Sequence, residues 1–507
     1  MEARALVERW QRGRASVGPD GRVVLSAARG LGLVSKVRRA YDWIAERVLQ
    51  VPYEDLEFGP PQVLGRGRLK VQVHQGGGWC SFLLLPLLTL LTRQRLLIVG
   101  GPGRGKTSVA TLMALLAGIS PEEVRRSIQR GHPQLTVADL LGAPLPSELI
   151  KAQDTREVRV AWRRWISLPV KVVDEYNRIP TKTQSALLSL MAEGYAELFE
   201  QVQHAGPSSW FLTANDDLGG GTFEVIEALR DRIDMVVRCP PYNGRLLEAL
   251  VEKASRAHGG EPNVPRDLVL TPEELERASE EVLALAVPPE VTDALGFFAG
   301  QLDFCARAAE RVEFMNKDTL HLSGRRLAQV CNEDCPLDKQ EHLCTQSENG
   351  VSARAYQSLL RYAKALAWFR RKASVGVEEV RALLPWALHD KLRPNPQSAF
   401  FQKPEHHVYL TDRVAWIHQL FDRALTQRAF YAPTRAPVLK LTLKVEKALD
   451  AADDNTLRAR LTELEAQLSR LLEQGELSAP LHDDVLALRR LHARCRRRLE
   501  ARQSEDS

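Results

Sequence analysis

The chain has 507 residues, of which 44% are hydrophobic, which is enough for two to four domains with cores of their own. Its net charge of +5 is the balance of 69 basic and 64 acidic residues, and a surplus this small does not by itself imply nucleic-acid binding. The first 16 residues lack the apolar core of a signal peptide, and the most apolar run, residues 82–91, is shorter than the about 20 residues that span a bilayer. Seven cysteines, an odd number, argue against a disulfide framework. These observations predict a cytoplasmic protein without membrane insertion.

Apolar periodicity divides the chain into four segments. Residues 1–90 form a mostly helical N-terminal region, and residues 91–243 alternate short apolar runs with helical patterns. Residues 244–394 are helical in pattern and contain a polar, cysteine-bearing insert at 325–350. Residues 395–507 form a C-terminal helical or coiled-coil region.

The first half of the chain predicts a parallel sheet. A helix is expected over residues 31–49 and a short strand over 69–73, between loops rich in glycine and proline. Three apolar runs follow, at 96–99, 170–173 and 210–214, each of the length of a buried strand. Strands that alternate with helices predict a parallel sheet with both faces covered.

The first motif that carries chemistry is GGPGRGKT at residues 100–107, which fits G-x-x-x-x-G-K-[ST]. It lies between a predicted strand and a predicted helix at 108–116, where backbone N–H groups of the glycine-rich loop can surround phosphates. Lys106 is expected to neutralise the β and γ oxygens of ATP, and Thr107 to bind Mg²⁺. The predicted nucleotide-binding residues of this loop are Gly100, Gly103, Gly105, Lys106, Thr107 and Ser108.

Two adjacent acids end the next strand. In the sequence VKVVDE, Asp174 is expected to hold Mg²⁺ together with Thr107, and Glu175 to polarise the attacking water as general base. Acids at the end of a strand are common in solvated loops, but their position after a phosphate-binding loop favours the catalytic interpretation.

Two further residues are candidates for the same reaction. Asn215 follows the strand predicted at 210–214, where its amide can orient water, although a turn asparagine is the ordinary alternative. Arg232 can stabilise charge on the transferred phosphoryl group, in its own site or in that of a neighbouring subunit. The alternative for Arg232 is a surface ion pair with Asp231 or Asp234.

The second half of the chain predicts helices, at residues 275–285, 291–308, 355–371 and 377–392. In the tail, leucines recur at alternating spacings of four and three, which is a heptad seam. The seam consists of Leu457, Leu461, Leu464, Leu468 and Leu471. A break at 475–480 and a second helix at 485–499 complete a predicted antiparallel hairpin.

The insert at 325–350 is a candidate metal site. Cys331, Cys335, His342 and Cys344 lie in a polar segment with few apolar residues, which a structural Zn²⁺ would order. Cys305 is an alternative ligand, and with it four thiolates would also suit an iron–sulfur cluster. The remaining alternative is a reduced insert with incidental thiols.

The order of these motifs resembles the MoxR branch of AAA+ ATPases. The sequence DEYNRIP at 174–180, followed by KTQSALL at 182–188 and MAEG at 191–194, is similar to the family's D-E-I-N-R-x-x-x-K-T-Q-x-A-L-L and M-x-E-x. The sequence GVSARA at 350–355 is similar to the G-x-S-x-R-A that opens the lid helix, which places the family's sensor 2 arginine at Arg354. Asn215 corresponds to sensor 1, and Arg232 to the arginine of the family's D-R-F segment.

This resemblance covers residues 91–392 and implies a fold and a role. The fold is an α/β AAA+ P-loop core with a parallel sheet, followed by an all-α lid domain, to which the tail adds the helical hairpin. The implied protein is a ring, usually a hexamer, that hydrolyses ATP to remodel or mature protein clients, together with a partner that carries a von Willebrand factor A domain. The family's insertion before the second acidic motif is expected near residues 144–154, lining the central pore. Tyr176 and Ile233 depart from the family pattern.

Two other functions are open at this point. A nucleic-acid-stimulated AAA+ motor is the main alternative, because the last helix carries Arg489, Arg490, Arg494, Arg496, Arg497, Arg498 and Arg502. No aromatic-interleaved basic patch or strongly basic domain accompanies them, so nucleic acid is not the predicted partner. A switch that only binds ATP is disfavoured by Glu175, since pure binding needs no water-activating acid.

Overall fold

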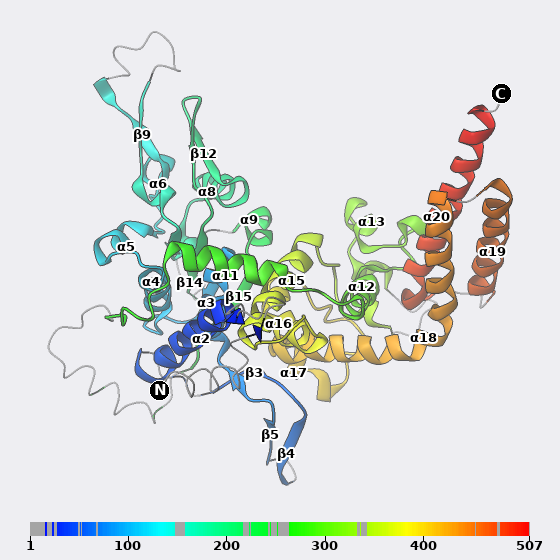
Figure 1. The fold of residues 1–507 in the computed structure, drawn as a ribbon, viewed down its shortest axis with the longest axis horizontal. Helices are drawn as coiled ribbons and strands as arrows, with labels where there is room; N and C mark the ends of the chain where they lie inside the picture. Colours follow the sequence, from blue (N-terminus) through cyan, green and yellow to red (C-terminus); the bar gives the residue numbers. More distant parts are fainter. Residues whose placement is uncertain are drawn as a thin grey trace. The chain divides into compact units, whose positions relative to one another are not determined.

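The structure is a computed structural model of the whole chain (Figure 1). The residues that it describes are 16–17, 23–24, 28–48, 51, 53–66, 69–147, 158–215, 223, 225–241, 244, 251, 263–331, 335, 342–451, 453–473 and 477–505. They form two compact units, one of residues 1–287 with 354–387 and one of residues 288–353 with 388–507. No helix within the described ranges combines the length and the apolar character that crossing a membrane requires.

The first unit is built on a parallel five-stranded sheet. Its strands are β7 (Arg95–Val99), β8 (Ile128–Arg130), β11 (Val170–Asp174), β14 (Ser209–Ala214) and β15 (Met235–Arg238), in the order β15-β7-β14-β11-β8. Every neighbouring pair is parallel, so the carboxyl ends of all five strands lie along one edge. The three predicted strands are therefore confirmed, and all six residues of β14 are buried, as expected for a central strand.

Helices cover this sheet. They are α2 (Ala28–Trp43), α3 (Ser81–Thr92), α4 (Lys106–Leu116), α5 (Pro121–Ser127), α6 (Val137–Leu141), α8 (Thr181–Glu193), α9 (Glu227–Asp231), α11 (Pro272–Ala284), α15 (Ala353–Phe369) and α16 (Val377–Leu388). Eleven of the twelve residues of α3 are buried, which confirms that the most apolar run of the sequence is an interior helix. Residues 354–387, from the predicted lid, belong to the same compact unit as the sheet.

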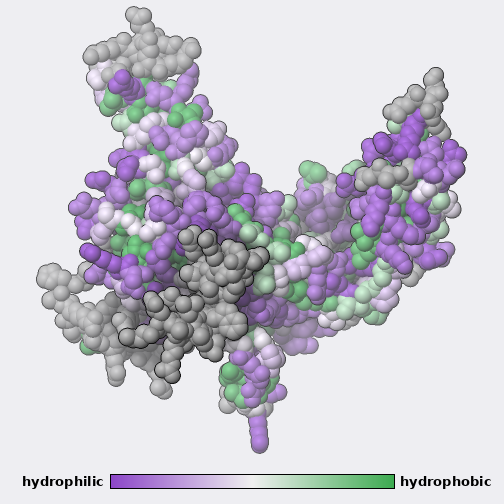
Figure 2. Space-filling model, viewed as in Figure 1, coloured by the Kyte–Doolittle hydropathy of each residue, from purple (hydrophilic) through white to green (hydrophobic). Residues whose placement is uncertain are grey.

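Three antiparallel ribbons extend the first unit (Figure 1). They pair β9 (Gly142–Pro144) with β10 (Val160–Trp162), β12 (Tyr195–Leu198) with β13 (Gln201–His204), and β4 (Pro61–Arg66) with β5 (Leu69–His74). The ribbon of β9 and β10 lies where the sequence predicts an insertion near 144–154, but residues 148–157 are outside the described residues. The β4–β5 ribbon projects with Val63, Leu64, Val71 and Val73 exposed, which Figure 2 shows as hydrophobic colour on this projection.

The second unit is helical. It contains α12 (Pro289–Asp303), α13 (Lys317–Leu322), α14 (Leu327–Val330), α17 (Val408–Thr411), α18 (Arg413–Ala451), α19 (Asp454–Leu472) and α20 (Ala479–Glu505). The leucine seam of α19 packs against α20, so the predicted hairpin is confirmed. The third helix of this bundle is α18, which lies in the helical region expected from residue 395 but was not predicted as one helix. Its Val438, Leu441, Val445 and Leu449 complete the same core.

Lys171 in β11 is a buried cation inside the sheet. Its side chain is 0% exposed, and Nζ donates to the carbonyl oxygens of Leu168 at 2.7 Å and Ala205 at 3.4 Å. Burial lowers the pKa of Lys171 from 10.5 to about 7. Between pH 7 and pH 10.5, Lys171 is mostly protonated in the unfolded chain and mostly neutral in the folded chain. The free energy of unfolding therefore rises as the pH rises from 7 to 10.5.

Replacing Lys171 by methionine is expected to stabilise the protein below pH 7. At pH 6 the folded wild type carries the full cost of a buried charge, so Lys171→Met should raise the free energy of unfolding by about 2 kcal/mol after the loss of two hydrogen bonds. The gain should vanish by pH 9, where folded Lys171 is neutral. Denaturant unfolding at the two pH values measures this, with the exposed Lys182→Met as control; an equal effect at both pH values would contradict the assigned pKa.

Candidate active site

The phosphate-binding loop follows β7 and opens α4, as its motif predicts. Gly103 and Gly105 have φ angles of 72° and 81°, in the left-handed region that favours glycine. Gly100 lies against Cys239, and a Cβ on Gly100 would be 2.8 Å from the Cβ of Cys239. The loop therefore uses glycine for both its turn and its close packing, and α4 begins at Lys106 with its free N–H groups beside the loop.

Lys106, Thr107 and the acidic residues of β11 come together at the carboxyl edge of the sheet. Lys106 Nζ donates to the carbonyl oxygens of Gly100 at 2.5 Å and Gly101 at 2.9 Å, and to Asn215 Oδ1 at 2.7 Å. Thr107 Oγ1 donates to Asp174 Oδ1 at 2.8 Å. A hydroxyl and a carboxylate are the oxygen ligands that Mg²⁺ prefers, so this pair suits a nucleotide-bound magnesium ion.

Glu175 is held in a defined orientation by two side chains. Asn215 Nδ2 donates to Glu175 Oε1 at 2.7 Å, and Arg178 Nη1 approaches Glu175 Oε2 at 2.9 Å. Its backbone has a φ of 54°, a strained conformation for a residue with a side chain and one that clusters at active sites. The structure thus places Asn215 between Lys106 and Glu175, a position from which its amide can orient both a phosphate ligand and a water.

Two residues of this site were missed by the sequence analysis as functional. Thr213 Oγ1 donates to Asp174 Oδ1 at 2.6 Å and accepts from the N–H of Glu175 at 2.9 Å, which fixes both acids. Arg178 forms the ion pair with Glu175. Two features of the sequence could have indicated these roles. Thr213 carries a hydroxyl two residues before Asn215, and Arg178 follows Glu175 by three residues.

Arg232 and Arg354 lie at the other edge of the sheet. Arg232 comes after α9, three residues before β15 begins, so it stands at the amino end of that strand. Arg354, in the first turn of α15, places Nη1 2.7 Å from Asp231 Oδ2. β15 pairs with β7 from Met235 to Arg238. This strand of four residues, or about 13 Å, separates the edge that carries Arg232 from the edge that carries the phosphate-binding loop.

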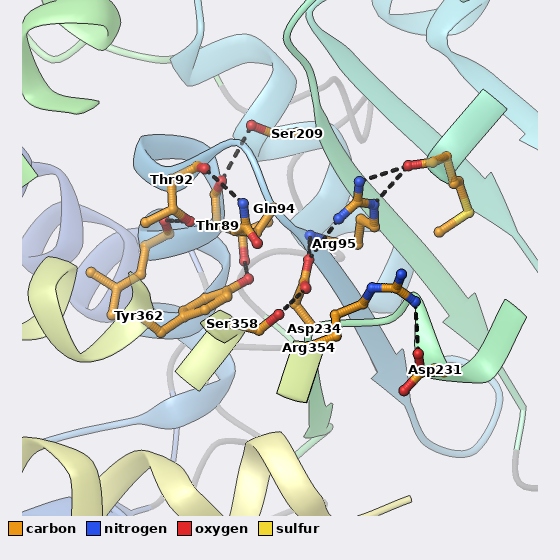
Figure 3. A network of polar contacts seen from close by, with 12 residues as sticks. Thr89, Thr92, Gln94, Arg95, Ser209, Asp231, Asp234, Arg354, Ser358 and Tyr362 are labelled. Atoms are coloured by element: carbon orange, nitrogen blue, oxygen red, sulfur yellow. Dashed lines mark hydrogen bonds and ion pairs between the residues drawn. The ribbon is translucent and has the colours of Figure 1, made fainter. Parts of the chain in front are cut away.

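A buried polar network attaches the helix of Arg354 to the sheet (Figure 3). Asp234, 1% exposed, accepts hydrogen bonds from the N–H of Arg95 at 2.8 Å and from Ser358 Oγ of α15. The guanidinium of Arg95 donates through Nη2 to the carbonyl oxygen of Met191 at 2.6 Å. One turn beyond Ser358, the Tyr362 hydroxyl lies 2.7 Å from Thr89 Oγ1. The network therefore fixes α15 beside Asp231 and Arg232.

Removing the Ser358 hydroxyl is expected to lower ATP turnover without unfolding the protein. Ser358→Ala deletes a hydrogen bond worth about 1 kcal/mol to a carboxylate that keeps its bonds from Arg95, so turnover should fall about fivefold if α15 must hold Arg354 in place. Gln357→Ala on the same helix is the control, because its side chain is exposed and makes none of the hydrogen bonds to Asp234, and it should leave turnover within about twofold. Steady-state ATPase assays with melting curves decide this, and equal losses in the two variants would exclude a specific role for Ser358.

The described residues do not support the zinc site predicted at the insert. All five candidate residues, Cys331, Cys335, His342, Cys344 and Cys305, are described, yet no group of three or more His, Cys, Asp or Glu side chains within the described ranges is arranged to hold a metal. Cys344 packs with Phe304 and Ala479, and Cys305 packs with Leu320, Leu327 and Val330. The thiols thus act as small apolar side chains.

The thiols of the insert lie near a buried cation. Burial raises the pKa of Cys344 to about 12, so in the absence of a metal this thiol stays protonated. The fully buried Lys317, whose Nζ donates to the carbonyl oxygen of Ser347 at 2.7 Å, interacts electrostatically with the same thiols, and a lysine at this place disfavours a second cation. The structure describes all seven cysteines, and no two of them form a disulfide.

Comparison with known proteins identifies two domains in the chain. Residues 95–235 match the family model "ATPase family associated with various cellular activities (AAA)", and residues 339–407 match the model "AAA lid domain". "Uncharacterized protein YeaC" of Bacillus subtilis (strain 168) is 23% identical over 321 residues, which are 62% of this chain and 83% of that protein.

Among solved structures, that of a candidate ATPase from Cytophaga hutchinsonii ATCC 33406 superposes with a TM-score of 0.51. The match covers 78% of this chain and 96% of that chain at 16% identity, so it shows a shared fold. The matched core of residues 95–235 contains the phosphate-binding loop, both acids of β11, Asn215 and Arg232. The chain therefore carries an ATPase core of the AAA+ type, an α/β domain that is followed by a helical lid region.

Proposed function

We propose that this ATPase is a MoxR-like remodeller of protein complexes that acts in the cytoplasm as a ring, in the form of a hexamer. The observation that carries the proposal is the position of Glu175, held by Asn215 and Arg178 beside Lys106 and Asp174. A carboxylate fixed there serves to activate water, which a protein that only binds ATP does not need. The nucleotide is ATP with Mg²⁺, bound by Thr107 and Asp174.

The residues that resemble the MoxR branch support this assignment because they build the same site. The matching sequence at 174–188 runs from the end of β11 through a short 3-10 turn, Tyr176–Arg178, into α8. Gln184 within it donates to the carbonyl oxygen of Ile179 and accepts from the N–H of Ile226. The motif therefore connects the catalytic acid to the chain that leads to α9 and Arg232.

The placement of the two arginines supports a ring. A chain whose Arg232 and Arg354 lie at the sheet edge opposite its own phosphate-binding loop is suited to complete the site of a neighbour. ATP would then be hydrolysed at the interface between subunits, and the partner with a von Willebrand factor A domain would bring the protein client to the ring.

Stimulation of the ATPase tests this function. Full-length protein is assayed with a von Willebrand factor A domain protein encoded beside it and, separately, with single- and double-stranded DNA. We expect several-fold stimulation by the protein, and a stable complex with it when Glu175→Gln holds ATP. Stimulation by DNA with a steep salt dependence, and no complex with the protein, would instead establish the nucleic-acid motor.

A further inference from the structure

A groove in the C-terminal bundle is lined by arginines. It lies between the end of α18 and the last turns of α20, and has a volume of about 450 Å³. Its lining residues are Leu449, Arg494, Arg497, Arg498 and Ala501. On the face in view, Figure 2 shows a predominantly hydrophilic surface over these C-terminal helices.

Six arginines of α20 fall into two sets, and Arg490 belongs to neither, since it does not line the groove and pairs with no described carboxylate. On the sides that meet other elements they pair with acids: Arg489 with Glu313 at 2.7 Å, Arg496 with Glu465 at 3.5 Å, and Arg502 with Asp454 at 3.1 Å. The three arginines of the groove have no such partner, because no described carboxylate lies within ion-pair distance of Arg494, Arg497 or Arg498. Among the described residues, acids thus neutralise one set, whereas the three groove arginines are available to a ligand.

The spacing of the groove arginines concentrates positive charge. Positions 494, 497 and 498 are neighbours on a helix surface, with about 5–6 Å between Cβ atoms, and like charges at this spacing destabilise a helix slightly. Guanidinium groups bind carboxylates through two parallel hydrogen bonds, the strongest pairing available to them. The buried Leu449 and the small Ala501 give the groove an apolar part beside this charge.

We propose that this groove is a docking site for a short acidic segment of a partner protein. Two or three carboxylates of the segment pair with Arg494, Arg497 and Arg498, and an apolar side chain packs beside Leu449. No lining residue of the groove offers an aromatic ring on which a base could stack, so the groove fits an acidic peptide better than nucleic acid.

Fluorescence anisotropy on the full-length protein tests the site, with no nucleotide added, so that binding is separate from ATP hydrolysis. The probe is a labelled ten-residue peptide of Asp and Glu around one Leu, with an Asn and Gln version and an oligothymidylate of equal length for comparison. We expect the acidic peptide to bind, the amide version not to bind, and salt to weaken binding.

Two matched triple variants locate the binding. Arg494→Gln, Arg497→Gln and Arg498→Gln together should weaken peptide binding about tenfold or more. Arg489→Gln, Arg496→Gln and Arg502→Gln together remove the same charge from the same helix and should change binding less than about twofold. If the groove triple loses helical signal, single Arg497→Gln and Arg498→Gln changes at exposed positions take its place. Equal losses in both triples, absence of peptide binding, or tighter binding of the oligothymidylate would each overturn the proposal.

Discussion

Replacing Glu175 by glutamine is expected to leave ATP binding intact and to lower turnover about a hundredfold or more. Glutamine has the shape of glutamate, and its single amide oxygen can still accept one of the two hydrogen bonds that hold Glu175, from Asn215 at 2.7 Å or from Arg178 at 2.9 Å. Its amide oxygen, however, cannot take the proton of the attacking water. The expected result is therefore a protein that binds ATP and remains in the ATP-bound state because hydrolysis is slow.

Two other variants make this result specific. Lys106→Ala should weaken nucleotide binding itself, because Lys106 is the cation that meets the phosphates. Glu197→Gln, an identical change at an exposed position of β12, should leave both binding and turnover unchanged. Nucleotide titration and phosphate release measure the two quantities separately. Turnover at the wild-type rate in Glu175→Gln would remove Glu175 from the mechanism.

Replacing Arg232 by alanine is expected to abolish most hydrolysis while ATP still binds, with a loss of about a thousandfold. The reason is the arrangement of the sheet. Asp174 and Asn215 stand at the carboxyl ends of β11 and β14, whereas Arg232 precedes the amino end of β15. Arg354 beside Asp231 should behave in the same way as Arg232, because it lies at the same edge.

Mixing experiments decide whether these arginines serve a neighbouring subunit. In an equal mixture of Arg232→Ala and Glu175→Gln proteins, about a quarter of randomly formed interfaces join an intact Glu175 to an intact Arg232, since each subunit uses a different surface at a head-to-tail contact. Activity should therefore return, although each variant alone is inactive. Wild-type turnover should also rise faster than linearly with protein concentration. A stable monomer with strictly linear activity, and no recovery on mixing, would exclude a shared site.

The sequence by itself determined the nucleotide end of the site. The glycines at 100, 103 and 105, the acids at 174 and 175, and Asn215 each follow a short apolar strand. In a parallel sheet such positions meet at one edge, so contiguous motifs were enough to bring Lys106, Asp174, Glu175 and Asn215 together. Helical periodicity located α15 and α19, because each buries a regular face.

Other features depended on contacts between distant residues. The helix α18 was missed because it buries Trp416, Ile417 and Phe421 in its first half and Val438, Leu441 and Val445 in its second. Pro433 and Pro437 lie between these halves, where a proline bends a helix and changes its buried face.

The arginines and the cysteines show what only the tertiary structure decided. Arg354 is 122 residues from Arg232 in the sequence, and only the packing of α15 through Ser358 and Asp234 brings it beside Asp231. The spacing of Cys331, Cys335 and Cys344 is compatible with a metal, but Cys344 packs against Phe304 and Ala479, and the described residues contain no group arranged to hold a metal. A local motif fixes which groups are present, whereas burial and the folding of distant segments fix their charge and their neighbours.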